Sequence, residues 1–92
     1  MAKNLQEAAA EVSAVYVALH KGHMRMPDVI AMAKEATYAG EGHLAAALSN
    51  AVFARADEQD RLRFGMFLYA NGQKEMIPLP YVMKVKNGMG KI

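Results

Sequence analysis

Apolar residues recur every three or four positions over the first forty residues, the spacing that places them on one face of a helix. The stripe of the first predicted helix consists of Leu5, Ala8, Val12, Val15, Tyr16 and Leu19. Asn4, three residues before Glu7, is expected to cap its start, and Gly22 is expected to end it. A second helix is expected from Pro27 to about Ala39, because the first turn of a helix needs no N–H from a proline.

The densest apolar spacing lies in the stretch 42–72, which the pattern predicts to be helical. Its two stripes are Leu44, Leu48 and Val52, then Leu62, Met66 and Tyr69. The charged sequence DEQDR at 57–61 separates them and is too polar to be buried. Nothing in it breaks a helix outright, so we favour one continuous or slightly kinked helix that ends at Asn71-Gly72. The alternative is a break at Asp57, whose side chain can cap a further helix.

The last twenty residues change character, because two prolines stand at 78 and 80. A proline disfavours helical geometry in the residue before it. Tyr81, Met83 and Val85 then alternate with other residues, which is typical of a strand. Asn87-Gly88 is the preferred dipeptide of a two-residue hairpin turn, so 82–86 is expected to pair with 89–92.

These patterns predict a mainly α fold: a small bundle of three to four antiparallel helices with a short extended or β-hairpin C-terminal segment. Residues 1–72 form the expected helical domain. Residues 73–92 form an extended segment, packed on that domain or used in assembly. Much of the 53% hydrophobic content of the 92 residues is alanine, so the core is expected to be modest. Oligomerisation is a common source of additional burial for such chains, and we expect a homo-oligomer.

Composition narrows the classes of function. The chain has no cysteine, which excludes disulfides and thiolate chemistry. No apolar run approaches the ~20 residues of a membrane span, so we expect a cytoplasmic protein with no membrane partner. The net charge is +2, and the excess of lysine lies in 73–92. No nucleophile and base stand at a catalytic spacing, so we expect no enzyme activity and no cofactor.

Basic residues cluster in the loop 20–25, where Lys21 and Arg25 accompany two histidines. A helix N-terminus beside basic side chains can hold an anion, so a small anionic ligand is one hypothesis. A solvated basic turn is the simpler interpretation. His20 and His23 with His43 would supply three metal nitrogens, but Gly22 interrupts their helix, and we expect no metal site.

The segment 29–54 has the outline of a helix-turn-helix, with Ala36 and Gly40 at the spacing of the small residue and the turn glycine. Glu41 stands where an apolar residue is usual. The helix that would read DNA carries few groups able to contact base edges. Nucleic-acid binding is therefore the second hypothesis, and its phosphate contacts would come from the basic loop and the lysine-rich tail.

The favoured hypothesis is a small non-catalytic protein–protein interaction module of regulatory, adaptor or inhibitor type. Its size and style are common among phage and mobile-element accessory proteins. The tail is a candidate contact segment, because extended proline-containing segments lose little entropy on docking. The expected contact residues are Lys21, Arg25, Leu79, Tyr81, Lys84 and Lys86.

Overall fold

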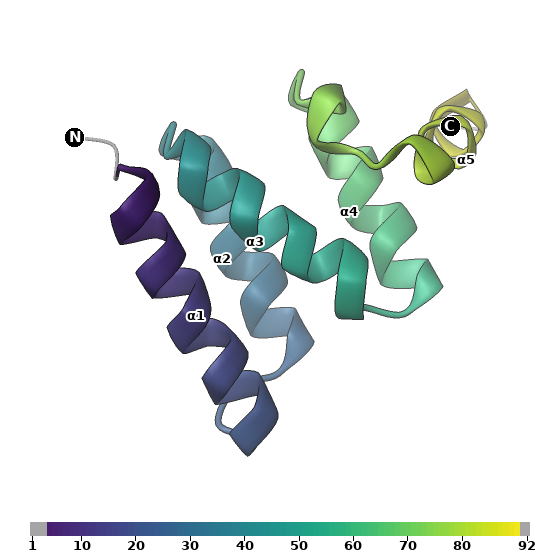
Figure 1. Ribbon diagram of the computed structural model, residues 1–92. Helices are drawn as coiled ribbons and strands as arrows, with labels where there is room; N and C mark the ends of the chain where they lie inside the picture. Colours follow the sequence, from purple (N-terminus) through teal and green to yellow (C-terminus); the bar gives the residue numbers. More distant parts are fainter. Residues whose placement is uncertain (1–3, 91–92) are drawn as a thin grey trace. The chain divides into compact units, whose positions relative to one another are not determined.

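The computed structural model describes residues 4–90 and confirms a mainly α protein (Figure 1). Five α-helices and one short 3₁₀ helix account for 83% of the described residues. The α-helices are α1 (Leu5–Lys21), α2 (Met26–Tyr38), α3 (Gly42–Arg55), α4 (Glu58–Ala70) and α5 (Leu79–Gly90), and the 3₁₀ helix is η1 (Lys74–Met76). The described part of the chain contains no strand.

The chain divides into two compact units, Met1–Ala54 and Arg55–Ile92. In the first unit α1, α2 and α3 lie beside one another (Figure 1). The Asn4 side-chain oxygen accepts a hydrogen bond from the Glu7 N–H at 2.8 Å, which confirms the predicted cap. Gly22 ends α1 in the left-handed conformation, with φ 77°, which glycine adopts without steric cost. Pro27 lies in the first turn of α2, as predicted.

The core of the first unit combines branched aliphatic residues with many alanines. Its most deeply buried side chains are Ala8, Val15, Val29, Ala33, Ala45, Leu48, Ala51 and Val52. Alanine contributes little apolar area, so each helix relies on a few larger residues. Ser49 on α3 is also buried, and among the described residues its hydroxyl has no hydrogen-bond partner.

The prediction of one continuous helix over 42–72 is wrong, and the alternative of two helices is confirmed. The helix is interrupted at Asp57, whose backbone is extended, with φ −71° and ψ 169°. Its Oδ1 accepts a hydrogen bond from the Asp60 N–H at 2.8 Å. Glu58 and Asp60 both lie in the first turn of α4, where negative charge stabilises the positive end of the helix dipole. The DEQDR sequence is therefore a helix start.

The prediction of an extended or hairpin C-terminal segment is also wrong, because residues 79–90 form α5. Pro80 is the second residue of α5, where a missing N–H costs nothing. The Tyr81 N–H donates to the Pro78 carbonyl at 2.9 Å and closes the first turn. Ile77, between η1 and α5, has extended geometry, with φ −83° and ψ 124°. The last two residues of the expected second strand, 91 and 92, lie outside the described residues.

Two glycines let α4 and α5 pack closely in the second unit. The Cα atoms of these helices approach within 8 Å along their contact. A Cβ at Gly65 on α4 would stand 2.5 Å from Val85 Cγ2, closer than real Cβ contacts. A Cβ at Gly88 on α5 would overlap the end of Met66. Gly88, which the sequence suggested as a turn residue, thus makes room for the neighbouring helix.

Candidate functional site

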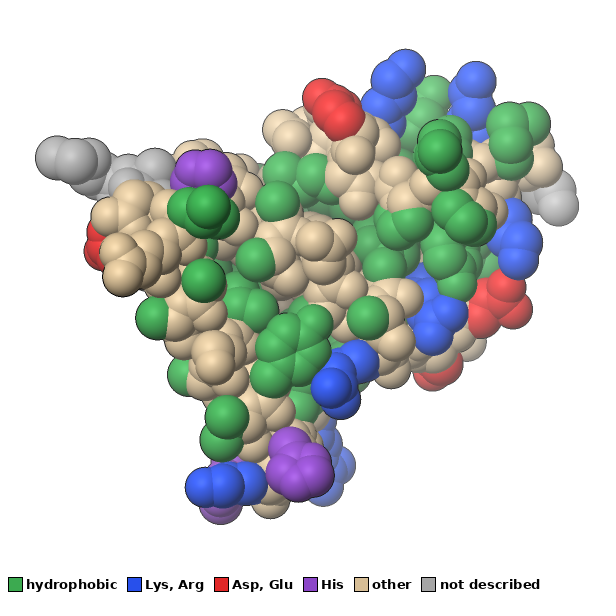
Figure 2. Space-filling view, viewed as in Figure 1, with side chains coloured by type: hydrophobic (Ala, Val, Ile, Leu, Met, Phe, Trp, Pro, Cys, Tyr) green, Lys and Arg blue, Asp and Glu red, His purple; other side chains and the backbone are tan. Residues whose placement is uncertain are grey.

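A surface groove with a volume of about 410 Å³ lies in the second unit. We call it the α5 groove, and its lining residues are Tyr69, Lys74, Glu75, Ile77, Leu79, Val82 and Lys86. They come from α4, η1, the link after η1, and α5. The volume falls in the range of about 300–1,000 Å³ that is usual for binding pockets. In Figure 2 hydrophobic side chains gather over α4 and α5, with Lys or Arg side chains around them.

The close packing of α5 on α4 determines which α5 residues reach the surface. Val85 faces α4 and is fully buried. Leu79, Val82, Met83 and Lys86 have the spacing i, i+3, i+4, i+7, so they share another side of the helix. Leu79 is 87% exposed and Met83 63% exposed. Only Leu79 of these two lines the groove.

The groove combines buried and exposed apolar surface. Ile77 is only 4% exposed, while Tyr69 and Val82 are half-buried. A large exposed side chain such as Leu79 beside a concave apolar surface is typical of an interaction site rather than of an isolated surface leucine. The groove can therefore remove apolar side chains of a bound molecule from water.

The charged residues of the groove are two lysines and one glutamate. Lys74 and Glu75 come from η1, and Lys86 comes from α5. Within residues 4–90, neither lysine of the groove forms an ion pair. By contrast, Lys84, which lies on the same helix as Lys86, forms an ion pair with Glu58, with Nζ 2.9 Å from Oε1. The groove thus carries a local excess of positive charge with no internal partner.

Tyr81 and Lys84, two of the expected contact residues, belong to a group of polar side chains that connects α4 to α5. We call this group the polar joint; its α4 members are Glu58 and Arg61. Arg61 Nη1 donates to Tyr81 Oη at 2.6 Å, and Arg61 Nε donates to the Ala56 carbonyl at 2.6 Å. Arg61 and Lys84 lie 5.9 Å and 5.8 Å from the centre of the Tyr81 ring. This geometry permits cation–π attraction, so both expected residues have a role in joining the helices.

The ion pair in this joint shifts the titration of both partners. The hydrogen bond from Lys84 and its positive charge lower the pKa of Glu58. The same hydrogen bond and the Glu58 charge raise the pKa of Lys84. Both side chains are exposed, so water screens their attraction.

Lys21 and Arg25, the other expected contact residues, lie in the first unit, and both are exposed. The Arg25 N–H donates to Asp28 Oδ2 at 3.0 Å, at the start of α2. The chain therefore supplies its own carboxylate at the helix end where the sequence suggested an external anion. Of the six expected contact residues, only Leu79 and Lys86 line the α5 groove.

The helix-turn-helix outline corresponds to α2 and α3. Ala45 and Ser49, which would lie on the reading helix, are buried. Exposed positions on this helix include His43, Ala46 and Asn50, which offer two polar side chains for base edges. This surface supplies little for direct readout of a nucleotide sequence.

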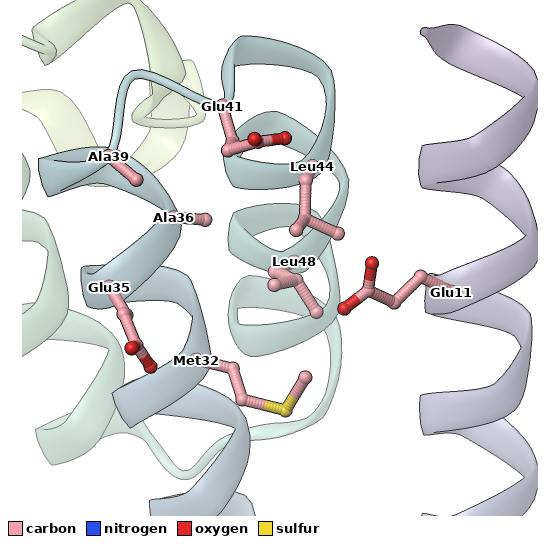
Figure 3. Close-up of a pocket in the computed structure, with 8 residues that line it drawn as sticks. All are labelled: Glu11, Met32, Glu35, Ala36, Ala39, Glu41, Leu44 and Leu48. Carbon is pink, nitrogen blue, oxygen red and sulfur yellow. The ribbon is translucent and has the colours of Figure 1, made fainter. Parts of the chain in front are cut away.

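A second, smaller cavity of about 190 Å³ lies among α1, α2 and α3 (Figure 3). Glu11, Glu35 and Glu41 surround an apolar floor that includes Leu48 and Met32. The volume is below the usual range for ligand pockets. Within residues 4–90, no group of three His, Asp or Glu side chains is arranged to hold a metal ion.

Comparison of the chain with protein-family models, with curated proteins and with solved structures gives no match. Among the described helices, none has the length and apolar character needed to cross a membrane. The site must therefore be interpreted from its own chemistry. The other lining residues of the groove were not predicted as site residues: Tyr69, Lys74, Glu75, Ile77 and Val82. The spacing of Leu79, Val82, Met83 and Lys86 was the available signal for an exposed helical stripe.

Proposed function

We propose that this chain is a non-catalytic protein-interaction module and that the α5 groove is its binding surface. One observation carries the proposal: Leu79, 87% exposed, borders an apolar groove of about 410 Å³. Exposing a leucine beside apolar concave surface costs free energy, which a bound protein would recover by burying both. A regulatory, adaptor or inhibitor role suits such a module.

The chemistry of the groove also supports binding rather than catalysis. Its titratable side chains are Tyr69, Lys74, Glu75 and Lys86, and no hydrogen bond among them organises a nucleophile with a base. Catalysis by such groups requires that positioned pair. Apolar anchors with charged residues at the edge are instead the usual composition of a protein interface.

Site-specific photocrosslinking tests the proposal, and the absence of native cysteine makes one introduced thiol unique. A benzophenone attached in Glu75→Cys places the probe at the groove, and one attached in Ser13→Cys on α1 is the control. In an extract of the native host, we expect the groove probe to form a discrete protein adduct that the control lacks. Excess unlabelled wild-type chain should compete with this adduct.

Two further substitutions locate the contact. Leu79→Asp in the Glu75→Cys background is expected to abolish the adduct, while Met83→Asp leaves it. Both positions are exposed on α5, so neither change should unfold the helix. An adduct insensitive to Leu79→Asp would contradict the proposal. Crosslinking of the purified chain to itself would show that the partner is a second copy, in agreement with the expected homo-oligomer.

A further inference from the structure

We infer that the α5 groove binds an acidic amphipathic helix of a partner protein. This inference rests on the proposed function and adds the chemistry of the partner. Its first support is charge: Lys74 and Lys86 line the groove against a single carboxylate, Glu75. Neither lysine has an ion-pair partner within the described chain. Complementary charge on a partner improves both encounter and selectivity.

The second support is the nature of the lining. Ile77, Leu79, Val82 and the Tyr69 ring offer apolar surface between the two lysines. A partner must therefore present apolar side chains flanked by acidic ones. An amphipathic helix with leucine-like residues at i, i+3, i+4 and i+7 and glutamates beside them meets both requirements.

The third support concerns the backbone of the partner. Extended peptides commonly bind by adding a strand to an exposed sheet edge. Residues 4–90 contain no strand, so the described chain has no such edge to offer. A helix satisfies its own backbone hydrogen bonds and needs only side-chain contacts, which the groove supplies.

A panel of designed peptides tests the inference directly. The probe is a dye-labelled helix of about 18 residues, with leucines on one face, glutamates beside them and alanines elsewhere, because length and alanine content favour the helix in water. The comparison peptides are the same composition scrambled to remove the apolar face, and the same pattern with lysine in place of glutamate. Fluorescence anisotropy with the full chain measures each dissociation constant. We expect the acidic amphipathic peptide to bind at least about tenfold more tightly than either comparison.

Protein variants connect this preference to the groove. Lys74→Glu with Lys86→Glu is expected to weaken binding of the acidic peptide at least about tenfold and to strengthen binding of the lysine peptide. Lys21→Glu with Arg25→Glu is the charge-matched control, because both residues are exposed and neither lines the groove. Leu79→Asp is expected to weaken the binding of both amphipathic peptides, and Met83→Asp is expected to change their binding little. Circular dichroism verifies that each variant keeps its helix content.

The outcomes separate this inference from the proposed function. Equal binding of acidic and basic amphipathic peptides, still lost in Leu79→Asp, overturns the acidic partner and leaves a protein-binding groove. Binding of no peptide overturns the helical partner, while the crosslinking experiment still decides the groove. A third outcome is that the chain shows no preference among the peptides but binds vesicles containing anionic lipid, and that Leu79→Asp abolishes this binding. That outcome overturns the helical partner and indicates a membrane surface instead.

Discussion

Gly65 on α4 lies directly against Val85 on α5, so that a Cβ at position 65 would stand 2.5 Å from Val85 Cγ2. Val85 is fully buried and cannot move into solvent. A methyl group at position 65 must therefore displace α5 or force Val85 from its rotamer. Because α5 supplies three of the seven residues that line the groove, this contact also helps to determine where Leu79 and Lys86 lie.

Gly65→Ala is accordingly expected to destabilise the chain by about 1–3 kcal/mol, the usual cost of overpacking a core, despite the better helix propensity of alanine. Urea denaturation followed by circular dichroism measures this change. Gly90→Ala is the control, because a Cβ there meets nothing within 4 Å. It should leave stability unchanged or slightly higher. A Gly65→Ala variant as stable as Gly90→Ala would contradict the packing described.

A double variant tests the same contact through its partner. Val85→Ala alone is expected to cost about 2 kcal/mol, from lost apolar burial and the space left behind. In Gly65→Ala/Val85→Ala the new methyl group occupies part of that space. The combined loss should therefore be smaller than the sum of the two single losses. Additive losses would show that the two residues do not share one contact.

Ser49→Ala is expected to stabilise the chain by about 1 kcal/mol. The Ser49 hydroxyl is buried without a hydrogen-bond partner among the described residues, and an unsatisfied buried polar group costs about 1–3 kcal/mol. Ser13→Ala on the exposed side of α1 corrects for the helix propensity of alanine, up to ~0.7 kcal/mol. The melting temperature of each variant measures the difference, and a gain no larger than that of Ser13→Ala would contradict the burial of an unpaired hydroxyl.

Substituting Tyr81 or Arg61 in the polar joint should lower the free energy of unfolding by unequal amounts. Tyr81→Phe removes one hydrogen-bond acceptor, and we expect a loss of about 1 kcal/mol. Arg61→Ala removes both the bond to Tyr81 and the bond to the Ala56 carbonyl, so a loss of about 2 kcal/mol is expected. Denaturant unfolding measures both. Losses in the opposite order would show that Arg61 does not bridge the start of α4 to α5.

The Glu58–Lys84 pair predicts a defined dependence on pH. The pKa of Glu58 is lowered on folding, so its stabilisation is present above its unfolded pKa and is lost as pH falls through its folded pKa. The pKa of Lys84 is raised, so its stabilisation is present below its unfolded pKa and is lost as pH rises through its folded pKa. The pair therefore stabilises the chain from about pH 5 to about pH 10.

An NMR titration of the Glu58 carboxyl group measures this coupling. In Lys84→Gln the pKa of Glu58 should rise toward its ordinary value, because the hydrogen bond from Lys84 is the main cause of the shift. Lys86→Gln is the control and should leave the titration unchanged. An identical Glu58 titration in wild type and Lys84→Gln would show that the pair does not persist in solution.

Local signals in the sequence were sufficient for α1 and α2, the first two helices. Asn4, Gly22 and Pro27 mark helix ends through their own side chains or backbone, and the structure has each at the expected place. Asp57 carried an equally local signal. It was given too little weight because a charged sequence is also compatible with a continuous helix.

Predicting the C-terminal helix α5 required information from residues that are distant in the sequence. The Asn87-Gly88 dipeptide favours a turn when neighbours along the chain are considered alone. Its actual role depends on Met66, which lies 22 positions earlier and occupies the space left by the missing Cβ. The groove was only partly predictable for the same reason. Leu79 and Lys86 could be named from the sequence, but the contributions of Tyr69 and Ile77 require the path of the chain through η1.

The connections within the first unit also have a kinetic consequence. Residues 22–25 join α1 to α2, and residues 39–41 join α2 to α3. Helices joined by such short segments find each other with little loss of chain entropy. Helical domains dominated by contacts near in sequence fold within microseconds to milliseconds. During synthesis, residues 4–54 can thus form their three-helix arrangement once Ala54 has left the ribosome, while the groove-bearing residues 69–86 are still inside the exit tunnel.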